Sequence, residues 1–188
     1  MKGKDIKEMI KTALSLFIIC AVAAGLLAGI NGLTAPAIAE NDQKKADESR
    51  KAVFPEATSF EEKTAEDGSV FYIAFTDSEK SGYIFTTSSN GYGGKIKVMT
   101  GINIDGTINK VSVLEINETP GLGMKAKNES FLNQYSGKSE KLTVTKNGKS
   151  AENEIDAITS ATISSDAVTS AVNSALEMYN AIMSGEEE

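Results

Sequence analysis

The clearest candidates for chemistry lie in a hydroxyl-rich segment, residues 156–165 (DAITSATISS). A stretch with helical periodicity follows, so Ser164 or Ser165 can act as an ordinary helix N-cap. The same place also suits an anion, because the first N–H groups of a helix are free and its dipole is positive there. The sequence therefore leaves two interpretations open, a capped loop or a phosphate carried by Thr162.

Two glycine-bearing segments are the next candidates. Residues 118–123 (ETPGLG) follow an expected strand, and Pro-Gly suits the centre of a type II turn. The alternative is a binding loop, in which glycines admit a flat ligand and Leu122 covers one face of an aromatic ring system. Residues 91–94 (GYGG) precede another expected strand, and by themselves they indicate only a glycine-rich loop.

Composition excludes several classes of protein. The 188 residues include no histidine, which removes Ser-His and Cys-His nucleophile pairs and most schemes for binding zinc or haem. A single cysteine, Cys20, forms neither an internal disulfide nor a thiolate cluster. The net charge of −7, without a long basic stretch, disfavours nucleic-acid binding. Any redox chemistry must come from an organic cofactor, and we expect no metal site and no catalytic side chain.

Taken together, these segments resemble the FMN-binding domain of the G subunit of the Rnf electron-transport complex. The order of features also matches: one N-terminal apolar span, GYGG before a strand, GINIDG at 101–106, ETPGLG, and last a flavinylation sequence. The resemblance extends from Lys11 to about Met183, which makes it more specific than any one motif.

The resemblance implies a covalent cofactor. In this family a flavin transferase reads Asp-x-x-Ser/Thr-Gly-Ala-Thr and joins FMN through its phosphate to the last threonine. Asp156 would then be recognised by the transferase and Thr162 would carry FMN as a phosphoester, although Ser160 stands where glycine is usual. The other residues expected to bind the cofactor lie in the same segments: Thr159, Ser160, Ala161, Ser164, Glu118, Thr119, Pro120, Gly121, Leu122, Gly123 and Tyr92.

The resemblance also implies a function, the relay of electrons in a complex that couples transfer between reduced ferredoxin and NAD to Na⁺ or H⁺ transport. The expected partners are the other Rnf membrane and redox subunits and the FMN transferase. Because the chain has no Cys cluster and no Gly-x-Gly-x-x-Gly after a strand, stand-alone catalysis is not expected. Two alternatives remain: the C subunit of the Na⁺-translocating NADH:quinone oxidoreductase, for which the chain is short, and a non-redox anchored binding module.

An apolar segment near the N-terminus predicts a membrane anchor. Residues 12–39 carry no charge, and residues 13–30 would form a helix of roughly 27 Å, close to the ~30 Å hydrocarbon core. Four lysines precede this segment and acidic residues follow it, which predicts a cytoplasmic N-terminus (1–11), a span (12–35) in the cell inner membrane and an extracytoplasmic body. The alternative is a signal peptide cleaved near residues 35–39. A lipoprotein is disfavoured because Ile19 precedes Cys20.

The elements that must position the candidate residues indicate an α+β fold with an antiparallel sheet and flanking helices. Pro36 is expected to open a helical stalk (36–55), followed by an FMN-binding domain (56–185) and an acidic tail (186–188). Strands are expected at 69–76, 82–87, 95–104, 107–116 and 141–145, with a hairpin turn at Asp105-Gly106 and a helix over 124–135. A last helix starts at Ser164, and its apolar positions share one face: Val168, Ala171, Val172, Ala175, Leu176, Tyr179, Ile182 and Met183.

Overall fold

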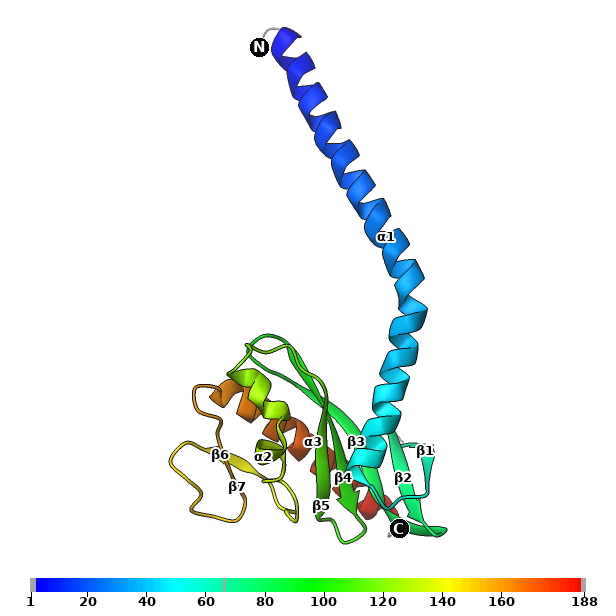
Figure 1. Cartoon of the computed structure of the whole chain (residues 1–188), viewed down its shortest axis with the longest axis vertical. Coiled ribbons are helices and arrows are strands. Elements are labelled where there is room, and N and C mark those ends of the chain that lie inside the picture. The colour runs from blue at the N-terminus through cyan, green and yellow to red at the C-terminus, as the bar shows by residue number, and fades with distance from the viewer. Residues whose placement is uncertain (1–2, 66, 187–188) are drawn as a thin grey trace. The chain divides into compact units, whose positions relative to one another are not determined.

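The computed structural model describes residues 3–65 and 67–186, and the chain divides into two compact units, Met1–Lys44 and Lys45–Glu188. Helix α1, Gly3–Val53, supplies the first unit and the beginning of the second (Figure 1). The helix passes through Pro36, so the expected helix start at that residue is wrong. Proline removes one backbone hydrogen bond, but helix-forming residues on both sides continue the helix.

The apolar part of α1 is long enough to cross a membrane. Residues 12–39, all of which lie within this helix, carry no charged side chain. Helix α1 is the single such candidate among the described residues, which agrees in length and composition with the expected span.

The second unit is built on a five-stranded antiparallel sheet whose strands follow chain order. The strands are β1 (Ser59–Thr64), β2 (Val70–Thr76), β3 (Glu79–Asn90), β4 (Lys95–Asn103) and β5 (Ile108–Glu115). The last four confirm the expected strands, with ends shifted by a few residues. The sequence did not predict β1, because Phe60 is its only half-buried residue and no alternation is visible.

Each face of the sheet is covered by a helix. Tyr83 and Phe85 of β3 point into the main core, which is completed by the apolar face of α3 (Thr162–Glu186). Ile84 points the other way, into a second cluster with Val53 and Phe54 at the end of α1. The helix therefore joins the domain from Lys45 onward, inside the segment expected to be a stalk. The α+β architecture with flanking helices is confirmed.

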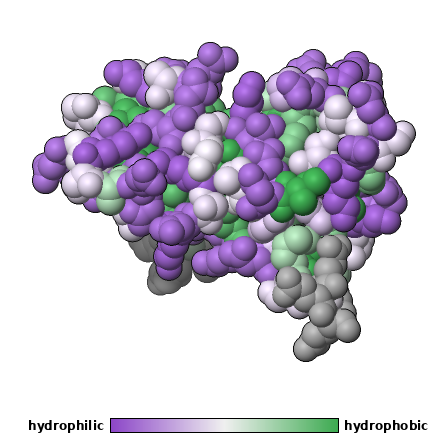
Figure 2. All heavy atoms as spheres, turned by 90° about the horizontal axis from the view of Figure 1, so that it is seen from below, coloured by the Kyte–Doolittle hydropathy of each residue, from purple (hydrophilic) through white to green (hydrophobic). Residues whose placement is uncertain are grey.

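Two glycines make room for Phe54 on this second face. A Cβ atom at Gly82 would lie 2.6 Å from the Phe54 ring, and one at Gly101 would lie 2.9 Å from it. The face shown in Figure 2 is mostly hydrophilic, with apolar side chains in separate patches. The residues that form the two apolar clusters of the sheet are buried.

The hairpin between β4 and β5 forms where it was expected. Asn103 N–H donates to Thr107 O at 2.8 Å, and Gly106 has a φ of +83°. The Asp105 carboxylate accepts hydrogen bonds from the hydroxyl and the N–H of Thr107, which lowers the pKa of Asp105 from its ordinary value. The turn is closed by local bonds and confirms the prediction from Asp105-Gly106.

The segment between β5 and α3 differs most from expectation. The predicted helix over 124–135 is wrong: it divides into a 3₁₀ helix η1 (Gly123–Lys127) and a short helix α2 (Glu129–Leu132). Asn128 between them is extended, and its carbonyl accepts the N–H groups of Phe131 and Leu132. Two three-residue strands follow, β6 (Thr143–Thr145) and β7 (Glu154–Asp156), which pair in parallel. The first lies within the expected strand 141–145, and the second was not predicted.

Candidate functional site

Thr162 is the first residue of α3 and is half-buried. A four-residue turn precedes it, in which Ala161 N–H donates to Ile158 O at 2.9 Å. The exposed residues Thr159 and Ser160 form the centre of this turn, and Ser160 has a φ of +63°. Glycine suits that left-handed conformation best, which agrees with the glycine that the resemblance implies at this position.

Replacing Ser160 with glycine is expected to stabilise the domain. A left-handed conformation costs an L-residue roughly 1–2 kcal/mol, which glycine avoids. Part of this gain is offset, because glycine loses more conformational entropy on folding than serine does. We expect the free energy of unfolding of Ser160→Gly to rise by about 0.5 kcal/mol, measured by denaturant unfolding. Ser139→Gly is the matched control: Ser139 is exposed, its φ is not positive, and its replacement should not stabilise.

The two serines expected as N-caps lie inside the first turn of α3, so that expectation is wrong. The Ser165 hydroxyl accepts the N–H of Ile158 at 3.0 Å and donates to Ala161 O at 3.0 Å. It thereby holds the turn ahead of Thr162 from within the helix. Sequence reasoning placed Ser165 only as a cap, because its true partners lie in the loop before the helix.

A second element fixes the chain before this turn. Asp156 ends β7, and its backbone N–H donates to the Gln134 side-chain oxygen at 2.9 Å. The Gln134 amide in turn donates to the Asp156 carbonyl at 3.3 Å. Gln134 therefore clamps the backbone that leads toward Thr162. No sequence pattern singled out Gln134, because an isolated glutamine in an expected helix is an ordinary surface residue.

A buried glutamate connects the three segments. The Glu118 side chain is only 7% exposed; one carboxylate oxygen accepts Gly93 N–H at 3.0 Å, and the other accepts the Ser164 hydroxyl at 2.8 Å. Residues 25 and 46 positions away in the sequence are thus joined through one side chain. The structure brings Glu118, Gly93, Gly123 and Ser164 together beside the start of α3.

Glycines are required here by close approach. A Cβ atom at Gly93 would lie 2.1 Å from Asn117 O, and one at Gly91 would lie 2.3 Å from a Glu118 carboxylate oxygen. At Gly123 a Cβ atom would lie 2.5 Å from the Ser164 hydroxyl oxygen. The GYGG and ETPGLG segments can lie against each other and against α3 only because these positions lack side chains.

The turn interpretation of residues 118–123 is confirmed. Leu122 N–H donates to Thr119 O at 3.2 Å, and Gly121 has a φ of +79°, as a type II turn requires after Pro120. Leu122 is 42% exposed, and Tyr92 in the GYGG loop is 74% exposed. The turn and a binding role are compatible, because the turn leaves Leu122 at the surface beside a fixed loop.

The site therefore combines a threonine hydroxyl at a helix N-terminus with glycine-rich loops and exposed apolar side chains. Residues 91–177 match the family of FMN-binding domains, and residues 1–53 match the RnfG N-terminal region. The G subunit of the Na⁺-translocating ferredoxin:NAD⁺ oxidoreductase complex from Acetobacterium woodii is 39% identical, with 93% of each chain covered. The chain belongs to the family of Rnf G subunits. Its second unit contains an FMN-binding domain, as expected.

Other relatives agree with this assignment. The G subunit of the proton-translocating ferredoxin:NAD⁺ oxidoreductase complex from Clostridium ljungdahlii is 30% identical, with 98% of each chain covered. The crystal structure of the C subunit of the Na⁺-translocating NADH-quinone reductase from Parabacteroides distasonis is 27% identical, with a TM-score of 0.52. That likeness covers 58% of this chain and 60% of the other, so the NADH-quinone reductase alternative is the weaker match for this Rnf family member.

Proposed function

We propose that this protein relays electrons through FMN bound covalently to Thr162, as one component of an Rnf membrane complex. That complex would transfer electrons between reduced ferredoxin and NAD and couple the transfer to ion movement. Support comes from two relatives whose names describe this reaction, one with Na⁺ and the other with protons as the translocated ion. The chain itself would act as a redox subunit without a stand-alone reaction.

The observation that carries the proposal is the double hydrogen bond of Glu118. It holds the GYGG loop and the ETPGLG turn against Ser164, two residues after Thr162. A phosphate on Thr162 would meet the N–H groups at the start of α3, which have no partner within the helix. Leu122 and Tyr92 would supply apolar cover for a planar ring system, so the residues present fit FMN.

Attachment is a phosphoryl transfer to a side-chain oxygen. A bond forms between Thr162 Oγ1 and the FMN phosphorus, a phosphoanhydride bond in an activated flavin donor breaks, and the rest of the donor leaves as a phosphate-bearing group together with the hydroxyl proton. The other expected partner, an FMN transferase, would supply the donor and would recognise Asp156, which Gln134 holds in place. Once bound, FMN would supply the capacity to accept and donate electrons.

The direct test is to make the full chain in a host with and without a flavin transferase. With the transferase we expect yellow protein, an intact mass increased by FMN less one water, and the modified peptide to contain Thr162. Protein made without the transferase is the control and should have the unmodified mass. A colourless, unmodified product in both hosts would instead favour a non-redox binding module.

The proposal includes a topology, with residues 1–11 in the cytoplasm and the domain outside a cell inner membrane. Four lysines before the apolar segment and acidic residues after it support this orientation. Protease added to intact spheroplasts should degrade the domain and leave a cytoplasmic marker protein whole. A protected domain would reverse the orientation, and a mature N-terminus near Glu40 would replace the anchor by a cleaved signal.

A further inference from the structure

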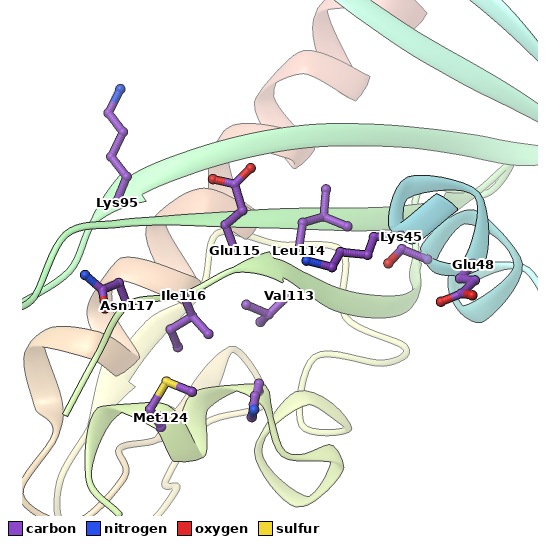
Figure 3. Close-up of a pocket in the computed structure, with 11 residues that line it drawn as sticks. Lys45, Glu48, Lys95, Val113, Leu114, Glu115, Ile116, Asn117 and Met124 are labelled. Carbon is purple, nitrogen blue, oxygen red and sulfur yellow. The ribbon is translucent and has the colours of Figure 1, made fainter. Parts of the chain in front are cut away.

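A cleft of about 560 Å³ opens along one edge of the sheet (Figure 3). Its floor is the end of β5, where Val113, Leu114 and Glu115 lie. The end of α1 forms one wall through Lys45, and η1 forms the opposite wall through Lys127. The cleft therefore runs along a strand, between the layers that cover the two faces of the sheet.

The floor is an unpaired strand edge. Strand β5 is the last in the sheet, and only its first residue has a second backbone partner: Ile108 N–H donates to Lys138 O, and Ile108 O accepts Gly137 N–H. These bonds show that the polar groups of Ile108 face away from β4. The pairing of β4 with β5 is irregular between Gly101 and Ile102, and the alternation of inward and outward groups is counted through this irregularity. It then places the N–H and C=O groups of Val111 and Val113 on the same outer side as those of Ile108. In the described part of the chain these groups have no backbone partner beyond β5.

The cleft has a small excess of positive charge, although the chain carries a net charge of −7. Three lysines line it, Lys45, Lys95 and Lys127, together with Glu48 and Glu115, and none of these lysines forms an ion pair within residues 3–65 and 67–186. Glu115 is already paired with Lys97 at 3.3 Å, so it offsets little of this charge. Such a cleft favours a negatively charged occupant.

We propose that an extended acidic segment of another protein of the complex docks in this cleft and adds to β5 as a sixth strand. Main-chain bonds to Val111 and Val113 would give affinity, and the three lysines would select acidic side chains. A second copy of this chain is disfavoured as the occupant, because two such edges would bring identical lysines together. The inference rests on the proposed role within a complex.

The cleft lies next to the segments of the candidate site. Three of the residues that line it are direct neighbours of the site segments: Lys95 follows Gly94, Asn117 precedes Glu118, and Met124 follows Gly123. A partner bound here would lie beside the loops proposed to hold FMN. Docking would therefore bring an electron donor or acceptor close to the site.

The first test reverses the charge of the cleft in the full chain, expressed together with the other subunits. In Lys45→Glu/Lys95→Glu/Lys127→Glu, we expect the partner subunits that copurify with the tagged chain to fall about tenfold. The control is Lys141→Glu/Lys146→Glu/Lys149→Glu, which changes the net charge equally at exposed positions outside the cleft. Equal retention of partners by both variants would overturn the proposal. Flavin fluorescence, recorded on the same samples, reports failure of the proposed function separately.

The second test separates strand addition from general charge attraction. Val113→Pro removes the outward N–H group, whereas Val113→Ala keeps it and controls for the loss of the valine side chain. We expect proline, and not alanine, to reduce partner retention, with thermal unfolding measured for both variants. Equal retention in the two variants, with both folded, would rule out the sixth strand.

A photocrosslinking amino acid in place of Glu115 gives a readout that does not depend on a disruptive variant. We expect a crosslink to an acidic, extended segment of a co-assembled subunit, identified by peptide mass. The same amino acid at Lys146, exposed and outside the cleft, should give none. A product of twice the chain's mass, or no crosslink from position 115, would overturn the proposal.

Discussion

Thr162→Ala protein is expected to emerge from the transferase reaction without covalent flavin. Alanine has no side-chain oxygen that could form the phosphoester at the first residue of α3. The fold should persist, because the described structure shows no side-chain hydrogen bond from Thr162 and alanine is a good helix former. The measurement is flavin fluorescence of the denatured protein in a gel, where only covalently bound flavin remains.

Two neighbouring variants sharpen this result. Thr162→Ser keeps a hydroxyl group at the same backbone position, so it should retain at least part of the modification. Thr159→Ser keeps the exposed hydroxyl that the recognition sequence requires and should still permit attachment at Thr162. Flavin remaining in Thr162→Ala, or found on residue 159 by peptide mass, would place the attachment at another residue.

Glu118→Ala should have the second largest effect, because it disconnects the site loops from α3. The variant leaves the buried Ser164 hydroxyl without its acceptor and releases Gly93 N–H, at a cost of about 2–3 kcal/mol in the free energy of unfolding. We also expect less flavin attachment, because the GYGG loop and the ETPGLG turn lose the side chain that joins them. Denaturant unfolding and gel fluorescence measure the two effects.

Glu118→Gln is the informative comparison. Its amide oxygen can accept Gly93 N–H and its amide N–H can donate to the Ser164 oxygen, so both connections survive. Stability and flavin attachment should then return close to their original values. Glu115→Ala controls for the loss of a nearby carboxylate, since Glu115 is exposed and should cost less than about 1 kcal/mol. Equal losses in all three variants would contradict the bridging role of Glu118.

Local signals made much of the fold predictable. The α3 positions from Val168 to Tyr179 are buried as their spacing indicated, and the Asp105-Gly106 hairpin is closed by bonds within a few residues. The motif segments were also found from the sequence. Each of these depends on periodicity or on short-range turn chemistry, which a single sequence displays directly.

The remaining features depend on contacts between distant residues. Glu118 looked like one end of a turn, and only the folded sheet shows that it reaches Gly93 and Ser164. The break at Asn128 and the clamp by Gln134 likewise follow from tertiary packing, which overrides the helical tendency of that segment. Strand β1, nearly all exposed, is held by its pairing with β2 and shows no pattern of its own.

The position of Phe54 decides where this protein can be cut and remain folded. A protease that cleaves just before Lys45 would leave the ring in the space that Gly82 and Gly101 provide. Cleavage after Pro55 would instead strip one face of the sheet and expose Ala74, Ile84 and Met99 to water. Cleavage at the first point is thus expected to release a folded fragment, and cleavage at the second a fragment that aggregates. The two points lie roughly three helical turns apart.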